Sequence, residues 1–435
     1  MKLILSILLF YYAESATSTF CFWNTGCPYK YFNSKTPYNV LRGDIRDSAV
    51  KLTDCEPISI WGLIRHGKRY PYTDSARQMQ DALVLKDYVV SSYEKGKSSL
   101  CAQDIENLQN WVLDKDMFSK PRQLTSEGYQ ELVGIGRRLI QAFPKLLSKL
   151  GKEEYTFRPA LGKWMQDSAK GFVEGLGNKQ LTVESPKDGF DIMDPYTSCE
   201  KYQREVNNTG IHEEVLKYEA TSEFLATIDR VHRRLGIDYE LTNVNLTSLY
   251  DLCRYTSSGI DNSVSSWCAL FTTEDLKILE YLEDLKHYYK NGYGTPLNEL
   301  FGQIPMADLL RNFQAAKEGS GKKVTAYFTH KTMMDMVYTS LNLFKDDSPL
   351  TGAQRVPNRK WRTSKISLFA SNLLAVLNKC KKDGADDYNV VFYLNEEPLR
   401  PICQDGVCSW QEFQDKLEPF LATNTDFFYC LFKSY

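Results

Sequence analysis

Apolar residues follow two different periods along the chain, and their alternation predicts an α/β fold. Residues 123–147 place apolar side chains at helical spacing behind a cap at Thr125 or Ser126, and further helices are expected after Pro71 and over 167–176. Apolar runs typical of buried strands occupy 58–64, 155–161, 323–330 and 388–399. Because strands alternate with helices, we expect a mostly parallel sheet flanked by helices.

The pattern changes at the start and in the middle of the chain. Lys2 precedes an apolar run and then small residues, which predicts a signal peptide over 1–18. In the middle, short helical patterns replace the strand signal and predict a helical insertion over 191–300. The α/β core would then consist of a first part, 19–190, and a second part with the C-terminal tail, 301–435.

Charge and hydropathy exclude some partners. The 435 residues carry 53 basic and 55 acidic side chains, a net charge of −2, so no general field attracts nucleic acid or an anionic membrane. No apolar run after the signal reaches the roughly 20 residues that a membrane-spanning helix needs. Any anion must therefore be bound by a local cluster of basic groups.

Cysteines and sequons indicate the secretory pathway. Eleven cysteines are scattered along the chain, and an oxidising lumen would convert most of them into disulfides. Cys403 and Cys408 bracket a turn-like stretch and are the most plausible local pair. Sequons at Asn207 and Asn245 predict glycosylation in surface loops. We therefore expect a secreted or lumenal glycoprotein.

Two of the predicted strands end in histidine, His66 and His330. Ligands of open α/β sheets bind at the carboxyl ends of strands, so both histidines are expected at one edge. In the stretch RHGKR, residues 65–69, Arg65 and Arg69 offer planar forks that bind phosphate or carboxylate oxygens in pairs. The two arginines would also keep His66 neutral, which suits a nucleophile or a metal ligand.

Simpler interpretations stand beside this anion site. A solvated basic loop is the alternative for 65–69, and the buried strand before it disfavours that reading. Metal binding ranks below anion binding because carboxylate or cysteine partners at ligand spacing are missing. His212, His232 and His287 are expected at the surface. The basic run 355–365 could line a cleft mouth, but a solvated surface loop is favoured.

The stretch RHGKRYP resembles the Arg-His-Gly-x-Arg-x-Pro signature of the histidine acid phosphatases. Further segments resemble the multiple inositol polyphosphate phosphatase branch of that family, at 31–38, 123–132, 167–176, 343–351, 369–377 and 394–399. The resemblance implies a histidine-phosphatase-like α/β core with an inserted helical subdomain. It also implies hydrolysis of phosphomonoesters, with inositol polyphosphates as the expected substrates and no metal or other cofactor.

The resemblance also assigns roles to residues. His66 would attack the phosphoryl group and form a phosphohistidine, while Arg65 and Arg69 would hold the phosphoryl oxygens. His330 would add a donor as charge develops on those oxygens in the transition state.

The sequence departs from the family at two places. Lys331 and Thr332 stand where related chains carry an aspartate or a glutamate that protonates the leaving oxygen, and neither is expected to do so in the usual way. Asp335 is the nearest carboxyl group and the candidate acid. Trp164 replaces a phosphate-binding arginine, for which Lys163 could substitute as a point charge. Reduced turnover is therefore expected, and the alternatives are a non-catalytic phosphate-ester binding protein or an inactive scaffold.

Overall fold

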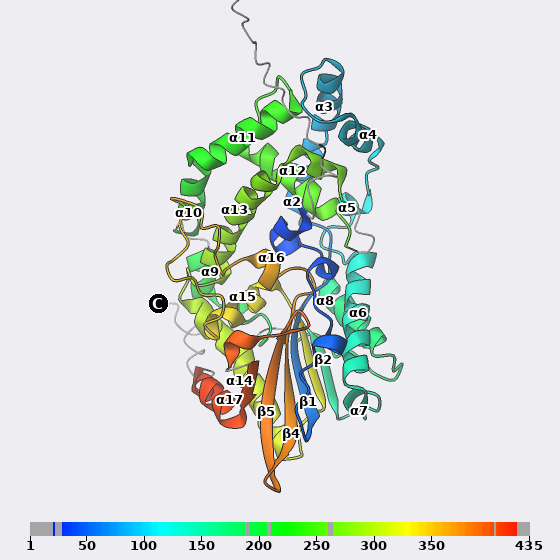
Figure 1. The fold of residues 1–435 in the computed structure, drawn as a ribbon, viewed down its shortest axis with the longest axis vertical. Coiled ribbons are helices and arrows are strands. Elements are labelled where there is room, and N and C mark those ends of the chain that lie inside the picture. Colours follow the sequence, from blue (N-terminus) through cyan, green and yellow to red (C-terminus); the bar gives the residue numbers. More distant parts are fainter. Residues whose placement is uncertain are drawn as a thin grey trace, which may run out of the picture.

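The computed structural model describes residues 21, 28–187, 189, 191–206, 210–259, 264–403 and 406–423. The expected signal peptide over 1–18 and the sequon residue Asn207 lie outside the described residues. Figure 1 shows a sheet at one end of the molecule and a group of helices at the other.

Seven strands of the described residues form one sheet in the order β2-β3-β1-β4-β5-β6, with β7 paired to β5. Their bounds are Cys55–Arg65 for β1, Tyr155–Pro159 for β2, Val324–Thr329 for β3, Asn372–Lys382 for β4, Ala385–Leu394 for β5, Glu397–Pro398 for β6 and Val407–Ser409 for β7. The four strands expected from the sequence correspond to β1, β2, β3 and β5, so the α/β class is confirmed.

The expectation of a mostly parallel sheet is wrong, because only β2, β3 and β1 run parallel. The pairs β1–β4, β4–β5, β5–β6 and β5–β7 are antiparallel. The antiparallel pairing of β4 with β5 comes from a two-residue turn, in which Asp383 and Gly384 both have positive φ, 51° and 82°. An Asp-Gly turn of this kind folds adjacent strands into a hairpin, so half of the sheet needs no helical crossover.

Helices cover both faces of the sheet (Figure 1). On one face lie α6 (Ser126–Ala142), α7 (Pro144–Leu147) and α8 (Lys163–Gly175), packed against Ile60 and Ile64 of β1. On the other lie α14 (Leu297–Lys317), α15 (Lys331–Ser340) and α17 (Trp410–Leu417), and Trp61 of β1 belongs to that core. The alternation along β1 explains why its apolar run is continuous, since a strand covered on both sides buries every side chain.

A helical lobe occupies the other end of the molecule (Figure 1). It combines helices from two stretches of the chain, and α2 packs on α12 and α3 on α11. Its members are α2 (Thr73–Ala82), α3 (Leu85–Glu94), α4 (Ala102–Asn110), α5 (Asp116–Ser119), α10 (Gly210–Glu219), α11 (Ser222–Leu235), α12 (Asn243–Thr256) and α13 (Thr273–Asn291).

The other helices of the described residues are short. The remaining α-helices are α1 (Ile45–Ser48), α9 (Glu200–Val206) and α16 (Thr363–Ile366). The 3-10 helices are η2 (Pro28–Tyr31), η3 (Asn33–Lys35), η4 (Tyr38–Val40), η5 (Pro195–Ser198), η6 (Ser266–Leu270), η7 (Arg400–Ile402) and η9 (Glu418–Leu421).

Disulfides link distant parts of the described chain. Cys55 is bonded to Cys380 across the β1–β4 pair. Further bonds join Cys21 to Cys101, Cys253 to Cys268 and Cys403 to Cys408. The last of these confirms the pair expected from the sequence. No helix among the described residues is long and apolar enough to cross a membrane.

Two surface predictions are corrected by the structure. The run 355–365 is not a solvated loop throughout, because Arg359 is buried and donates to Asp284 and to Glu280 of α13. Its charge is neutralised by that helix, which the sequence pattern of the run alone does not reveal. Asn245 lies in the first turn of α12 rather than in a loop, and its side-chain oxygen accepts a hydrogen bond from the backbone N–H of Thr242.

Candidate active site

The register of two parallel strands places His66 beside His330. Arg65 of β1 pairs with Thr329 of β3, so the two strands end at the same level and each is followed directly by its histidine. The backbone N–H of His66 donates to the carbonyl of Thr329 at 3.1 Å, and the two imidazole centroids lie 6.0 Å apart. The structure therefore brings together two residues that are far apart in sequence, at the edge where they were expected.

The loop after β1 is held against the start of α6. A Cβ atom on Gly67 would lie only 2.1 Å from the carbonyl oxygen of Gly128, so no side chain fits there. The backbone N–H of Lys68 donates to the carboxylate of Glu131 at 2.8 Å, and the backbone N–H of Thr125 donates to the carbonyl of Lys68 at 2.9 Å. These contacts fix the backbone that carries the basic cluster.

His66 has the tautomer and charge state of a nucleophile. Its Nδ1 lies 2.8 Å from the carbonyl oxygen of Gly67. A carbonyl can only accept, so Nδ1 carries the proton and Nε2 keeps its lone pair. Burial lowers the pKa of His66 well below 6.5, and the positive charges of Arg65 and Arg69 lower it further. The ring therefore stays neutral in acidic solution.

The two arginines retain unused donors. Nη1 of Arg65 donates to the carbonyls of Ser34 and Ser367, while Nη1 of Arg69 donates to the carbonyl of Tyr70 at 2.7 Å. Both guanidinium groups are buried, and the Nε atom of each has no partner among the described residues. Unpaired buried donors are costly, so two of them beside His66 indicate a site for an anion.

The histidines and arginines line a cavity of about 510 Å³. Its cationic lining consists of Lys35, Arg65, Arg69, Arg254, Lys286 and Lys331, against the carboxylates Asp251 and Glu283. Polar and aromatic groups complete the wall, among them Ser34, Tyr72, Tyr196, Tyr255 and Thr332. A cavity of this size accommodates a small molecule, and the excess of positive charge selects an anionic one.

The structure does not bring Lys163 or Asp335 to the cavity wall. Lys163, the first residue of α8, is exposed and forms an ion pair with Asp167. Asp335 is fully buried in α15, and the Nδ2 atom of Asn291 donates to it at 3.4 Å. Burial raises the pKa of Asp335 to about 7, but its carboxyl group does not face the cavity.

Trp164 and Arg122 occupy the region where a further phosphate-binding arginine was expected. The Trp164 ring centroid lies 5.9 Å from that of His330. The guanidinium of Arg122 lies 5.5 Å from the Trp164 ring and 5.6 Å from the ring of Tyr72, which lines the cavity. Arg122 was missed because it lies in the turn just before the family-like segment 123–132, and nothing in the sequence shows that it approaches Trp164.

The prediction that His287 lies at the surface is wrong. His287 is buried on α13, and its Nε2 atom is 2.6 Å from Nζ of Lys331. The prediction failed because the charged neighbours Glu283 and Lys286 line the cavity, so their charge does not mark an open surface of α13. Of the other two histidines, His212 is exposed as expected, whereas His232 is half-buried.

The low pKa of His66 predicts that the acid limb of activity will not follow an ordinary histidine. Protonation would remove the lone pair of Nε2, and the folded protein resists it until the pH is well below 6.5. We expect kcat/KM for nitrophenyl phosphate, corrected for substrate ionisation, to show no loss from His66 protonation as the pH falls from 6.5 to about 5. A decline centred near 6.5 that disappears in a variant at His66 would contradict this.

Comparisons with known proteins agree with this geometry. Residues 59–395 match the histidine phosphatase superfamily (branch 2). The chain is 29% identical over 412 residues to multiple inositol polyphosphate phosphatase 1 of Drosophila melanogaster, covering 92% of this chain and 87% of that protein. Its identity to the Homo sapiens protein of the same name is 27% over 427 residues, covering 90% and 87%.

Solved structures show the same fold. A phytase from D. castellii superposes with a TM-score of 0.73 at 15% identity, covering 91% of this chain and 86% of that chain. The multiple inositol polyphosphate phosphatase of Bifidobacterium longum in complex with inositol hexasulfate gives a TM-score of 0.63 at 16% identity, covering 85% and 92%.

Proposed function

The chain belongs to the histidine phosphatase superfamily (branch 2), and we propose that it is a phosphoric monoester hydrolase that releases phosphate from inositol polyphosphates. One observation carries the proposal. A buried, neutral His66 with its Nε2 lone pair free lies beside two arginines with unused donors, in a cavity whose charged lining residues are mainly cationic.

The proposed reaction begins with attack of His66 Nε2 on phosphorus, in line with the leaving oxygen. Arg65 and Arg69 hold the phosphoryl oxygens and neutralise their charge. Burial and the two arginines lower the pKa of His330 to about 3, so its ring stays neutral. Its N–H group donates a hydrogen bond to the phosphoryl oxygens as charge develops on them. Water then hydrolyses the phosphohistidine.

The charge of the cavity supports a highly phosphorylated substrate. Lys35 from η3, Arg254 from α12 and Lys286 from α13 surround the space beyond the two arginines. A substrate with several phosphate groups would meet a cation at each side of the reacting one. The names of the similar proteins from Drosophila melanogaster and Homo sapiens point to the same class of substrate.

We propose that the protein works in the secretory pathway or outside the cell. The predicted signal peptide, the disulfides and the two sequons support this location. Asn207 and Asn245 are the proposed glycosylation sites. The side chain of Asn245 is only partly buried at the start of α12.

A second candidate function is capture of phosphate esters without efficient hydrolysis. It is favoured by one observation, the lack of a carboxyl group from α15 in the cavity lining. Loss of a general acid typically reduces the rate roughly 100- to 10,000-fold. Binding by the arginines would survive such a loss.

Phosphate release distinguishes the two functions. The purified full chain, incubated with inositol hexakisphosphate at mildly acidic pH, is expected to release inorganic phosphate with saturation kinetics. Arg69→Ala should lower kcat/KM by roughly 100-fold or more, because a charged ligand of the transferring group is lost. If phosphate is not released but calorimetry detects binding that Arg69→Ala removes, the protein is a binder. If neither appears, both functions are excluded.

A further inference from the structure

The leaving oxygen of a phosphate ester of an alcohol needs a proton, and the carboxylates of the cavity are not free to supply it. Asp251 is paired with Arg254 at 2.5 Å. Glu283 contacts Arg254 at 3.2 Å and Lys286 at 2.9 Å. Burial alone would raise the pKa of Glu283, but these cations and Lys35 hold it well below 4.5. Glu283 is therefore ionised at any pH at which the protein is expected to act.

The hydroxyl groups of the lining are too weakly acidic. Burial raises the pKa of Tyr255 to about 12 and that of Tyr196 well above 10. Thr332, at the position of the expected glutamate, carries an aliphatic hydroxyl that holds its proton more strongly still. An efficient donor has a pKa near the working pH, and none of these groups meets that condition.

Lys331 is a proton-bearing side chain that lines the same cavity as His66 and His330. It is the first residue of α15 and follows His330 directly, and its side chain lines the cavity. Its Nζ atom lies 2.6 Å from Nε2 of His287 and 3.4 Å from Oγ of Ser34. An ammonium group can only donate, so His287 accepts through Nε2 and directs the side chain across the cavity wall.

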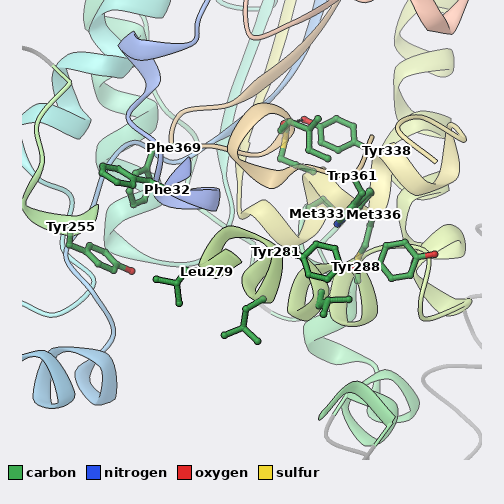
Figure 2. Packing of buried hydrophobic residues seen from close by; sticks show 14 of the residues in the cluster. Phe32, Tyr255, Leu279, Tyr281, Tyr288, Met333, Met336, Tyr338, Trp361 and Phe369 are labelled. Carbon is green, nitrogen blue, oxygen red and sulfur yellow. Dashed lines mark hydrogen bonds between the residues drawn. The ribbon is translucent and has the colours of Figure 1, made fainter. Parts of the chain in front are cut away.

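The helix that carries Lys331 is rigidly held. Met333, Met336 and Tyr338 of α15 are fully buried in the large hydrophobic cluster, together with Trp361 and Tyr281 (Figure 2). These contacts fix the start of α15 relative to α13. Packing therefore fixes the backbone of Lys331, and the contact with His287 orients its Nζ atom.

Charged and titratable groups reach Lys331 from every element around it. Lys35 of η3 and Arg65 of β1 are positive, while His287 of α13 is neutral because burial lowers its pKa well below 6.5. Glu283 of α13 and Asp335 of α15 oppose them. The net result is that burial, with Lys35 and Arg65, lowers the pKa of Lys331 well below 10.5. A lysine made more acidic in this way is suited to proton transfer.

We propose that Lys331 is the catalytic acid that protonates the leaving oxygen, and that His287 is the positioning residue that holds its Nζ atom. The proposal rests on the proposed function, which supplies the reaction. It replaces the sequence-based expectations that Lys331 is a defect and that Asp335 is the candidate acid.

The proton balance closes over one turnover. Nε2 of His66 forms a bond to phosphorus while the bond from phosphorus to the leaving oxygen breaks. The leaving oxygen takes that electron pair and a proton from Nζ of Lys331. The products of this step are a free alcohol and a neutral Lys331 amine. In the second half, water attacks phosphorus, its proton returns to Nζ of Lys331, and His66 leaves with its lone pair restored.

The test compares two substrates that differ in the leaving group. Glycerol 2-phosphate releases an alcohol and needs the acid, whereas nitrophenyl phosphate releases a stable anion and does not. We expect Lys331→Met to lower kcat/KM for glycerol 2-phosphate by roughly 100- to 10,000-fold, and that for nitrophenyl phosphate by at least about tenfold less. Lys331→Arg should behave similarly, because arginine keeps the charge but does not release its proton.

Lys35→Met is the matched control, since it removes a positive charge from the same cavity. Burial lowers the pKa of Lys35 to about 8, and its Nζ atom lies 3.4 Å from the carboxylate of Glu283. We expect Lys35→Met to lower kcat/KM by the same factor for glycerol 2-phosphate and for nitrophenyl phosphate. The substrate ratio is kcat/KM for glycerol 2-phosphate divided by kcat/KM for nitrophenyl phosphate. His287→Phe should shift this ratio in the same direction as Lys331→Met, and an unchanged ratio would overturn the positioning role.

The ratio of two substrates measured on one preparation does not depend on the folded fraction of a variant. If wild type hydrolyses both substrates and Lys331→Met lowers kcat/KM by the same factor for each, Lys331 only binds the anionic substrate and the proposal is overturned. If wild type hydrolyses neither substrate, the proposed function itself fails, and the two failures are thereby distinguished.

Discussion

Replacing His66 with alanine is expected to abolish phosphate release from every substrate, because alanine has no atom that can accept the phosphoryl group. Loss of a catalytic nucleophile costs roughly 10⁶-fold in kcat in a serine protease, and a loss of that order is expected here. Initial rates with nitrophenyl phosphate measure it over the widest range. The effect should exceed that of Lys331→Met, since a stable leaving group does not compensate for a missing nucleophile.

Two further measurements identify the role of His66. Wild type mixed with radiolabelled substrate and quenched in base should retain label on the protein, because a phosphohistidine is stable to base, and His66→Ala should retain none. The variant should still bind inositol hexakisphosphate in calorimetry, since Arg65 and Arg69 remain. His212→Ala is the control, because His212 is exposed on α10. Activity of His66→Ala within about tenfold of wild type would exclude the phosphohistidine mechanism.

The histidine pair could be predicted from sequence because two local signals are enough to define it. Each of β1 and β3 is a short apolar run that ends in histidine, and parallel strands in register end at the same edge. The motif at the end of β1 adds Arg65, the last residue of that strand, and Arg69 in the loop that follows. The hairpin of β4 and β5 was also encoded locally, by Asp383 and Gly384, but the helix–strand alternation elsewhere obscured it.

The rest of the cavity could not be predicted, because its side chains come from elements with no shared motif. Ser34 and Lys35 lie on η3, Arg254 on α12 and Lys286 on α13, and only tertiary packing brings them together. No periodicity in the sequence carries that information.

Helical phase explains the failure at Lys163. Successive residues of a helix point about 100° apart, so Lys163 and Trp164 cannot face the same group. Trp164 lies against His330, and Lys163 therefore faces solvent. Helical phase does not explain the failure at Asp335, which lies one turn after Lys331 on nearly the same side of α15. Asp335 is fully buried and does not reach the cavity wall.

Glu396 is expected to be the carboxylate whose loss most reduces stability. It is fully buried, accepts from Nε and Nη2 of Arg138 at 2.6 Å each, and accepts from the Tyr38 hydroxyl at 2.7 Å. These bonds join α6, η4 and the turn between β5 and β6. Glu396→Ala would leave the charge of Arg138 buried and unpaired, which typically costs about 3–5 kcal/mol. We expect a clear fall in the urea midpoint with the disulfides intact.

A surface pair provides the control for that measurement. Asp238 pairs with Lys97 at 2.8 Å, but both side chains are largely exposed, so Asp238→Asn should leave the urea midpoint unchanged. Glu396 does not line the cavity, and the folded fraction of Glu396→Ala should therefore keep the wild-type substrate ratio. Equal midpoints for the two variants would show that the Arg138 pair does not hold η4 to α6. The N-terminal segment that contains η3, with Ser34 and Lys35, would then be anchored by other contacts.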